Sequence, residues 1–139
     1  MNERINARLR ILEESLKRLE KIKEMRKEDF LRDPLAPPAA ERSFQVAIEV
    51  IIDLGNMLVS RLGLRSPETY SDIFRILGDA GILSQELVDE AIGMVRFRNL
   101  LVHAYVRVNP NIVYKLTKTK INVLRSLAKE LVEHLESHE

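Results

Sequence analysis

The segment from Asn2 to about Phe30 carries one apolar stripe, and this stripe is the feature that most limits the possible fold. Its apolar residues recur at steps of three and four: Ile5, Leu9, Leu12, Leu16, Leu19, Ile22 and Met25. That spacing places them on one side of an α-helix. Similar rows recur along the chain, which holds only five glycines, five prolines and no tryptophan. The pattern favours an all-α fold and argues against a turn-rich β-sandwich or barrel.

We predict an up-and-down antiparallel bundle of four long helices and one short helix. The long helices are expected over residues 2–30, 39–62, from 84 to about 102, and 110–139. The proline-containing connector 32–38 cannot stay helical. Ser84 and Asn109-Pro110 have the residue types that cap and begin helices. The short helix is expected to start at Ser66-Pro67-Glu68 and to pack through an apolar face: Tyr70, Ile73, Phe74 and Leu77.

Length and composition predict one domain over residues 1–139. The chain is 45% hydrophobic and 31% charged, which excludes a disordered chain. It has no cysteine, so disulfide scaffolds, thiolate zinc sites and cysteine nucleophiles are excluded. Its apolar runs are too short for a membrane span, and the start MNERINARLR lacks the apolar core of a signal peptide. We therefore expect a cytoplasmic protein.

The net charge of +1 hides an uneven distribution of charge. The segment from Ala91 to Lys129 has no acidic residue and eight basic ones: Arg96, Arg98, Arg107, Lys115, Lys118, Lys120, Arg125 and Lys129. This segment is +8, and the rest of the chain, with 14 basic and 21 acidic residues, is −7. Two explanations stay open: a partner that carries phosphates, or an acidic face of the same protein met in an oligomer.

The second predicted helix also carries a polar row: Glu41, Gln45, Glu49, Asp53, Asn56 and Ser60. Steps of three and four put all six on one side of the helix. Such a row is usually a solvated face. Asp53 fits that explanation less well than the others, because apolar residues flank it on both sides.

The residues best suited to chemistry lie at the end of the fourth predicted helix. Arg98, Asn99, His103 and Tyr105 fall within eight residues inside the acid-free segment. Asn99 lies one helical turn before His103, whereas Arg98 and His103 differ by roughly 140° on an ideal helix. Arg98 and His103 converge only if the arginine leans along the helix or the helix loosens. The alternative is a helix end with a satisfied histidine and a packed tyrosine.

Elsewhere the sequence offers little to a search for catalytic or metal sites. His134 and His138 lie in the last turns of the final helix, where histidine suits the negative end of the helix dipole. Three scattered histidines do not make a metal site. The sequence has no phosphate-binding glycine loop, no HExxH and no GxSxG.

The pattern Arg98-x4-His103-x-Tyr105 resembles the R-x4-H-x-Y signature of the HepT group in the HEPN superfamily. Arg98-Asn99 with His103 also fits the RN-x3-H form, and the order of helices matches over nearly the whole chain. The resemblance implies a toxin endoribonuclease that needs neither metal nor cofactor and works as a homodimer. It implies an MNT-type nucleotidyltransferase antitoxin as partner, which silences the nuclease by attaching AMP to Tyr105.

These residue types suit RNA cleavage by attack of the 2′-hydroxyl on the adjacent phosphate. His103 would transfer protons, and the guanidinium of Arg98 would stabilise the extra charge on phosphorus. Two histidines from a dimer could serve as base and acid. Tyr105 could contact RNA directly. Four further residues are supporting candidates: Asn99, Asp53, Glu49 and Arg96. One of the two acids would hold the imidazole or Arg98 if the polar row faces the motif.

Two other functions remain open. A binding subunit of a nucleotidyltransferase, from the same superfamily, would hold a nucleotide or substrate and cleave no RNA. In a helical interaction protein that has the motif by coincidence, replacement of His103 would change the behaviour toward neither RNA nor a partner. RNA cleavage in EDTA, lost on replacement of Arg98 or His103, distinguishes the nuclease from both.

Overall fold

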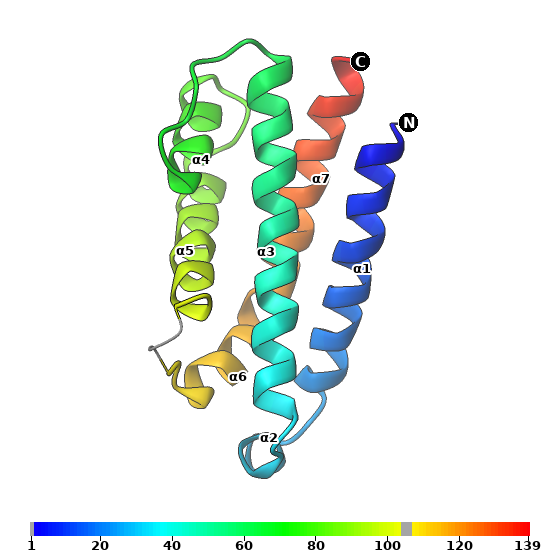
Figure 1. Cartoon of the computed structure of the whole chain (residues 1–139), viewed down its shortest axis with the longest axis vertical. Coiled ribbons are helices and arrows are strands. Elements are labelled where there is room, and N and C mark those ends of the chain that lie inside the picture. Colours follow the sequence, from blue (N-terminus) through cyan, green and yellow to red (C-terminus); the bar gives the residue numbers. More distant parts are fainter. Residues whose placement is uncertain (1, 104–106) are drawn as a thin grey trace.

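The computed structural model describes residues 2–103 and 107–139. Over these ranges the chain is helical and contains no strand (Figure 1). The helices are α1 (Glu3–Lys23), α2 (Lys27–Arg32), α3 (Ala36–Arg61), α4 (Tyr70–Asp79), α5 (Gln85–Leu101), α6 (Pro110–Thr119) and α7 (Ile121–Ser137). The prediction of an all-α helical bundle is confirmed, with shorter pieces than expected at two places. The prediction that residues 32–38 are not helical is wrong at its end, because α3 begins at Ala36 and holds Pro37 and Pro38 in its first turn, where proline is tolerated.

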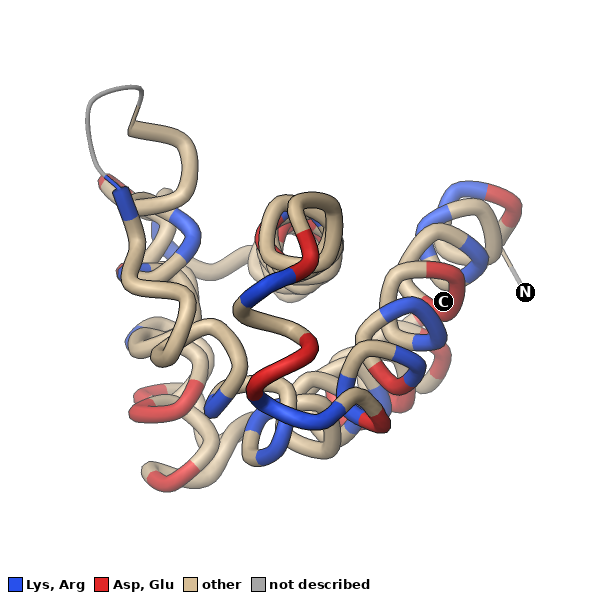
Figure 2. The backbone as a smooth tube through the Cα atoms, turned by 90° about the horizontal axis from the view of Figure 1, so that it is seen from below, with Lys and Arg blue, Asp and Glu red and all other residues tan. Residues whose placement is uncertain are grey.

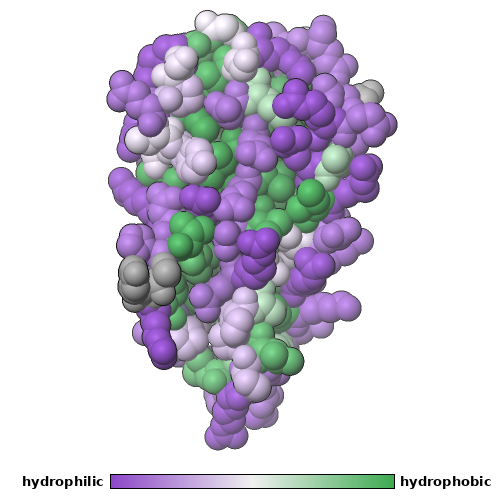
Figure 3. Space-filling view, viewed as in Figure 1, coloured by the Kyte–Doolittle hydropathy of each residue, from purple (hydrophilic) through white to green (hydrophobic). Residues whose placement is uncertain are grey.

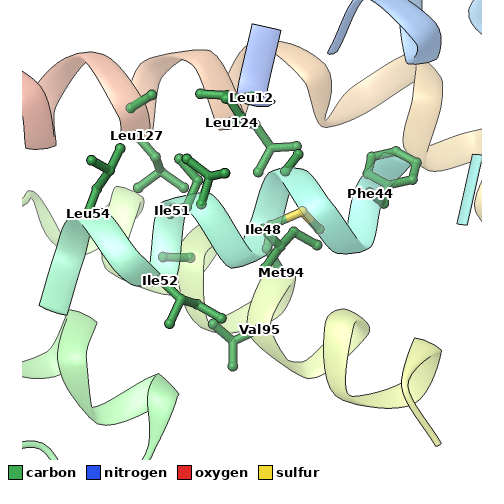
Figure 4. Close-up of a cluster of buried hydrophobic side chains, with 14 of the residues drawn as sticks. Leu12, Phe44, Ile48, Ile51, Ile52, Leu54, Met94, Val95, Leu124 and Leu127 are labelled. Carbon is green, nitrogen blue, oxygen red and sulfur yellow. The ribbon is translucent and has the colours of Figure 1, made fainter. Parts of the chain in front are cut away.

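The helix α3 is the centre of the bundle and packs against all six other helices. In Figure 1, α1 and α7 lie on one side of it, α4 and α5 on the other, and α2 and α6 near its first residues. Its side chains point toward both sides (Figure 4). Ile51 lies near Leu127 of α7, and Ile52 lies near Val95 of α5. The apolar row predicted for this helix is therefore only part of its buried surface.

The first helix ends earlier than predicted. It stops at Lys23, and a turn leads into the short helix α2. The turn lets α2 bury Phe30, whose ring packs against Tyr114 of α6 with ring centroids 5.2 Å apart. The Tyr114 hydroxyl also donates a 2.6 Å hydrogen bond to the carbonyl of Met25. Contacts with α6, which is distant in the sequence, thus end the helix at Lys23, although the apolar stripe of the sequence continues to Met25.

The last predicted helix is two helices, α6 and α7, rather than one continuous helix. It is divided at Lys120, which ends α6 and directly precedes α7. The ammonium of Lys120 forms a 2.9 Å ion pair with Glu90 of α5. The division lets α6 pack beneath the bundle while α7 runs beside α1 and α3 (Figure 1).

The start of the short helix also differs from the prediction. Thr69, not Ser66, is the capping residue, and its hydroxyl accepts a hydrogen bond from the Asp72 N–H. The Asp72 carboxylate in turn binds the guanidinium of Arg65 at 2.7 and 2.9 Å. The caps predicted at Ser84 and Asn109 are confirmed.

The helix α4 approaches α3 closely at Gly55. A methyl group added there would lie 2.9 Å from Cγ2 of Ile73 and 3.3 Å from the ring of Phe74. Both of these side chains are buried. The missing side chain therefore sets the distance between α3 and the beginning of α4.

On the face shown in Figure 3, polar and charged side chains cover most of the surface, and apolar patches show between them. A view from below shows charges of both signs along α1 and α7 (Figure 2). Among the described residues, α3 alone is long and apolar enough to cross a membrane, but 61% of its most apolar window is buried, as in the core helix of a soluble protein.

Candidate active site

The guanidinium of Arg98 is held in place by a carboxylate from α3. Oxygen Oε2 of Glu49 accepts a 2.9 Å hydrogen bond from Arg98 Nε and lies 2.8 Å from Nη2 in an ion pair. The same oxygen accepts a 3.3 Å bond from the amide of Gln45, one turn earlier. The Arg98 side chain is 18% exposed. Members of the polar row on α3 thus face the motif helix α5.

Two more side chains complete the setting of Arg98. Its Nη1 donates to Oδ1 of Asn99 at 3.2 Å, and its Cζ lies 5.3 Å from the centre of the Tyr70 ring. Among the described contacts, hydrogen bonds engage two of the five guanidinium N–H groups, so donors remain for another acceptor. The arrangement fixes a positive charge and keeps part of its hydrogen-bonding capacity for a ligand.

His103 lies just beyond the end of α5. Val102 caps the helix, and the His103 N–H donates to the carbonyl of Leu100 at 3.2 Å. The helix therefore loosens at the motif, and the histidine is exposed to solvent. Tyr105, the predicted modification site, lies outside the described residues.

Two of the predicted supporting residues lie apart from the Arg98 cluster. The carboxylate of Asp53 pairs with Arg8 of α1 at 3.4 Å. Arg96 is exposed and lines a different groove, between α5 and α6, together with Phe97 and Ile112. Asn99 and Glu49 are brought to Arg98, whereas Asp53 and Arg96 are not.

A groove of about 680 Å³ opens beside the cluster, between α3 and the start of α4. Its walls include Tyr70 and Asn99, the two residues that also contact Arg98, together with Asp53 and Asn56 of α3. Volumes of several hundred Å³ are typical of ligand-binding clefts. Asp53, although apart from Arg98, thus lies on a surface next to it.

Charge pairing organises the edge of this groove. The guanidinium of Arg65, helped by the backbone N–H of Glu68, lowers the pKa of Asp72 from 3.8 to about 2. Asp72 therefore stays ionised at neutral pH and anchors the turn that carries Tyr70. Among the residues that the structure covers, no group of three or more His, Asp or Glu side chains could hold a metal ion.

Tyr70 is the residue of the site that the sequence did not reveal. Its position on an apolar face indicated core packing, but the side chain is 49% exposed and lies under Arg98. The nearby polar row was visible in the sequence, yet nothing in the pattern singled out Tyr70 as the aromatic residue next to the motif arginine.

Comparisons with known proteins agree with this picture. Residues 12–131 match the family described as ribonuclease HepT-like. The tRNA nuclease HepT of Aphanizomenon flos-aquae is 29% identical over 110 residues, which cover 79% of this chain and 75% of that protein. The mRNA nuclease HepT of Shewanella oneidensis is 32% identical over 71 residues, covering 51% of this chain and 53% of that protein.

Two solved structures share the fold. The tri-AMPylated HEPN toxin of Shewanella oneidensis, in complex with an MNT antitoxin, superimposes with a TM-score of 0.87 at 22% identity, over 96% of this chain and 99% of the toxin. YutE of Bacillus subtilis, described as a cytosolic protein, superimposes with a TM-score of 0.79 at 25% identity, over 96% of this chain and 90% of YutE. With the family match over most of its length, the chain belongs to the HepT-like ribonuclease family.

Proposed function

We propose that this protein, with residues 1–139 as one catalytic domain, is a metal-independent endoribonuclease and the toxin of a toxin–antitoxin pair. The observation that carries this function is the arginine of the motif, held by Glu49 and Asn99 and still able to bind an anion. It lies five residues before the exposed His103. A fixed cation beside a group able to transfer protons is what phosphodiester cleavage requires.

The reaction is an internal displacement at phosphorus. The 2′-oxygen of one ribose loses its proton to an imidazole and bonds to the adjacent phosphorus. The 5′-oxygen of the next nucleotide leaves and takes a proton, which gives a 2′,3′-cyclic phosphate and a 5′-hydroxyl. Arg98 binds the phosphate oxygens and stabilises the charge that grows on them.

A homodimer supplies the second proton-transfer group. One imidazole cannot easily remove one proton and deliver another in the same step, whereas two copies of His103 around one phosphate can. Exposed apolar side chains near the motif support an interface there: Leu100 is 47% exposed, Val102 43% and Ile112 51%. Leu100 and Ile112 line one groove between α5 and α6.

The test is RNA cleavage in EDTA by the parent protein and by the variants His103→Ala and Arg98→Ala. Matched controls are His138→Ala and Arg10→Ala, which remove the same side chains from exposed sites at the end of α7 and on α1. We expect both motif variants to lose at least about 100-fold in kcat/KM while keeping their helicity by circular dichroism.

Each alternative gives a different result in this assay. Cleavage that EDTA abolishes contradicts the metal-independent mechanism, and full activity of His103→Ala contradicts the role of the motif. No cleavage by an unmodified parent protein, checked by intact mass, points instead to a nucleotide- or substrate-binding subunit.

Silencing acts at Tyr105. The tyrosine oxygen would bond to the α-phosphorus of ATP, pyrophosphate would leave, and the attached AMP would place a bulky anion two residues from His103. The partner is an MNT-type nucleotidyltransferase, supported by the Shewanella oneidensis toxin, which is tri-AMPylated and bound to an MNT antitoxin. Co-expression should raise the intact mass by whole AMP units, and Tyr105→Phe should abolish that increase.

The protein would act in the cytoplasm, where its RNA substrates are. The likeness to YutE, described as a cytosolic protein, supports this location. Fractionation of cells that express the protein with its antitoxin tests it, and recovery in the membrane pellet would contradict it.

A further inference from the structure

We propose that the groove between α3 and the start of α4 binds one RNA base that carries an exocyclic amino group, directly beside the scissile phosphate. This subsite rests on the proposed ribonuclease function and deepens it by naming which nucleotides are cleaved. Adenine, guanine and cytosine have such an amino group, and uracil does not. The groove would therefore discriminate against uracil at one of the two positions that flank the phosphate.

Tyr70 shows that the groove lies next to Arg98. This side chain lines the groove and also lies under the guanidinium of Arg98, 5.3 Å from ring centre to Cζ. Asn99 has the same double position, because it lines the groove and accepts a hydrogen bond from Arg98. A phosphate bound by Arg98 thus has an adjoining nucleoside at the mouth of the groove.

The shape of the groove suits a flat ring. Ile52 and Ile73, 4% and 2% exposed, line it with apolar surface, and the half-exposed ring of Tyr70 lies at its wall. Aromatic side chains stack on unpaired RNA bases, which supplies affinity without regard to sequence. The volume of about 680 Å³ is ample for one base and part of its ribose.

The charge of the groove disfavours a phosphate as its occupant, although Asp53 also pairs with Arg8 at 3.4 Å. Asp53 and Glu68 both line it, and the Asp53 side chain is 54% exposed. Carboxylates repel a phosphate group, whose binding is left to Arg98. The neutral base is the part of a nucleotide that can lie against these two acids.

Hydrogen bonding selects among the bases. Ionised carboxylates only accept hydrogen bonds, and the amide of the exposed Asn56 both donates and accepts. An exocyclic amino group donates to such acceptors, as in protein contacts with adenine and cytosine. Uracil has carbonyl oxygens on both sides of its N–H, and these oxygens would face the carboxylates.

The experiment uses oligonucleotides that are DNA except for one ribonucleotide, so that only one 2′-hydroxyl can attack. Sixteen sequences cover every combination of the two bases that flank the cleaved phosphate. Two more sequences replace adenine by purine and guanine by hypoxanthine, which removes one amino group each. The parent protein is compared with Asn56→Ala and Asp53→Asn. Matched controls are Asn122→Ala and Asp79→Asn, exposed residues outside the groove.

We expect the parent to cleave steps with an amino-bearing base about tenfold faster, in kcat/KM, than the same steps with uracil, at one of the two positions. Removal of the amino group from adenine or guanine should give the same loss. Asn56→Ala and Asp53→Asn should reduce the preference to within about threefold, and the controls should keep it.

Two results would overturn the subsite: equal rates for uracil and the other bases at both positions, or a preference that both groove variants leave intact. Failure of the ribonuclease function would be recognised separately, since no oligonucleotide would then be cleaved by the parent protein or by any variant.

Discussion

Glu49 and Arg98, 49 residues apart in the sequence, are joined by a hydrogen bond and an ion pair that meet at one carboxylate oxygen. Among the described residues, the other oxygen of Glu49 accepts no hydrogen bond, and part of the Arg98 guanidinium donates none. The pair therefore fixes the direction of the guanidinium without using all of its donors. Glu49 acts in this arrangement as a positioning residue.

Glu49→Gln should lower kcat/KM for RNA by about 10- to 100-fold, mostly through kcat, because a misdirected guanidinium still attracts RNA but stabilises the transition state poorly. The matched control is Glu90→Gln, which breaks the similarly exposed pair with Lys120. Steady-state kinetics on one short RNA separates the effects. A rise in KM with unchanged kcat would show that Glu49 does not position Arg98 for the chemical step.

Gly55→Ala should destabilise the protein by about 1 kcal/mol. The added methyl group meets Ile73 at 2.9 Å, and such overpacking costs about 1–3 kcal/mol, partly offset by the better helix propensity of alanine. Gly93→Ala is the matched control, since nothing lies within 4 Å of its added methyl group. That control should be more stable than the parent in urea unfolding. Equal stabilisation by both substitutions would mean that α4 can move away from α3 at no cost.

Asp72 should stabilise the protein at neutral pH and lose that effect in acid. Its folded pKa is about 2, below the ordinary 3.8, because Arg65 and the Glu68 N–H favour the charged form. The stabilisation is complete above the ordinary pKa and disappears as the pH falls through the folded one. Urea unfolding of the parent and Asp72→Asn should therefore differ at pH 6 and converge near pH 2. A difference independent of pH would contradict the charged pairing.

Arg125 joins α7 to two carboxylates of α1, Glu13 at 2.9 Å and Glu20 at 2.8 Å. Arg125→Ala should lower stability by up to about 1 kcal/mol, because these pairs are partly exposed and the two acids lose a shared counter-charge. Since surface ion pairs are screened by salt, the loss should shrink in 1 M NaCl. Thermal unfolding at low and high salt measures it, and an equal loss at both would indicate packing rather than charge.

Helix positions followed from the sequence where local chemistry decides them. Ser84 and Asn109 cap helices through their own side chains, so residue type was sufficient. The end of α1 at Lys23 depends on burial of Phe30, and the break between α6 and α7 at Lys120 depends on the pair with Glu90. Both contacts join segments that are distant in the sequence. Ser66 has the chemistry of a cap, but the clamp between Arg65 and Asp72 shifts the start of α4 to Tyr70.

Some residues of the site could likewise be predicted from the sequence, and others could not. Arg98, Asn99 and His103 stand together in the sequence, and the polar row on the second helix included Glu49 among six residues. Periodicity could not select Glu49 from that row, because the choice depends on how α3 crosses α5. Tyr70 could not be recognised at all, since an aromatic residue at a helix start packs inward or outward according to the neighbouring helix.

The helix that supplies Glu49 also contacts every other helix of the bundle. An opening that exposed the backbone of α3 would have to separate all of those contacts at once, so it would amount to global unfolding. The amides of α3 around Glu49 should therefore be among the slowest in the protein to exchange with deuterium, whereas those near Val102 exchange early. The arginine of the motif would thus be anchored from the most protected helix, while the adjoining histidine lies beyond the last turn of α5.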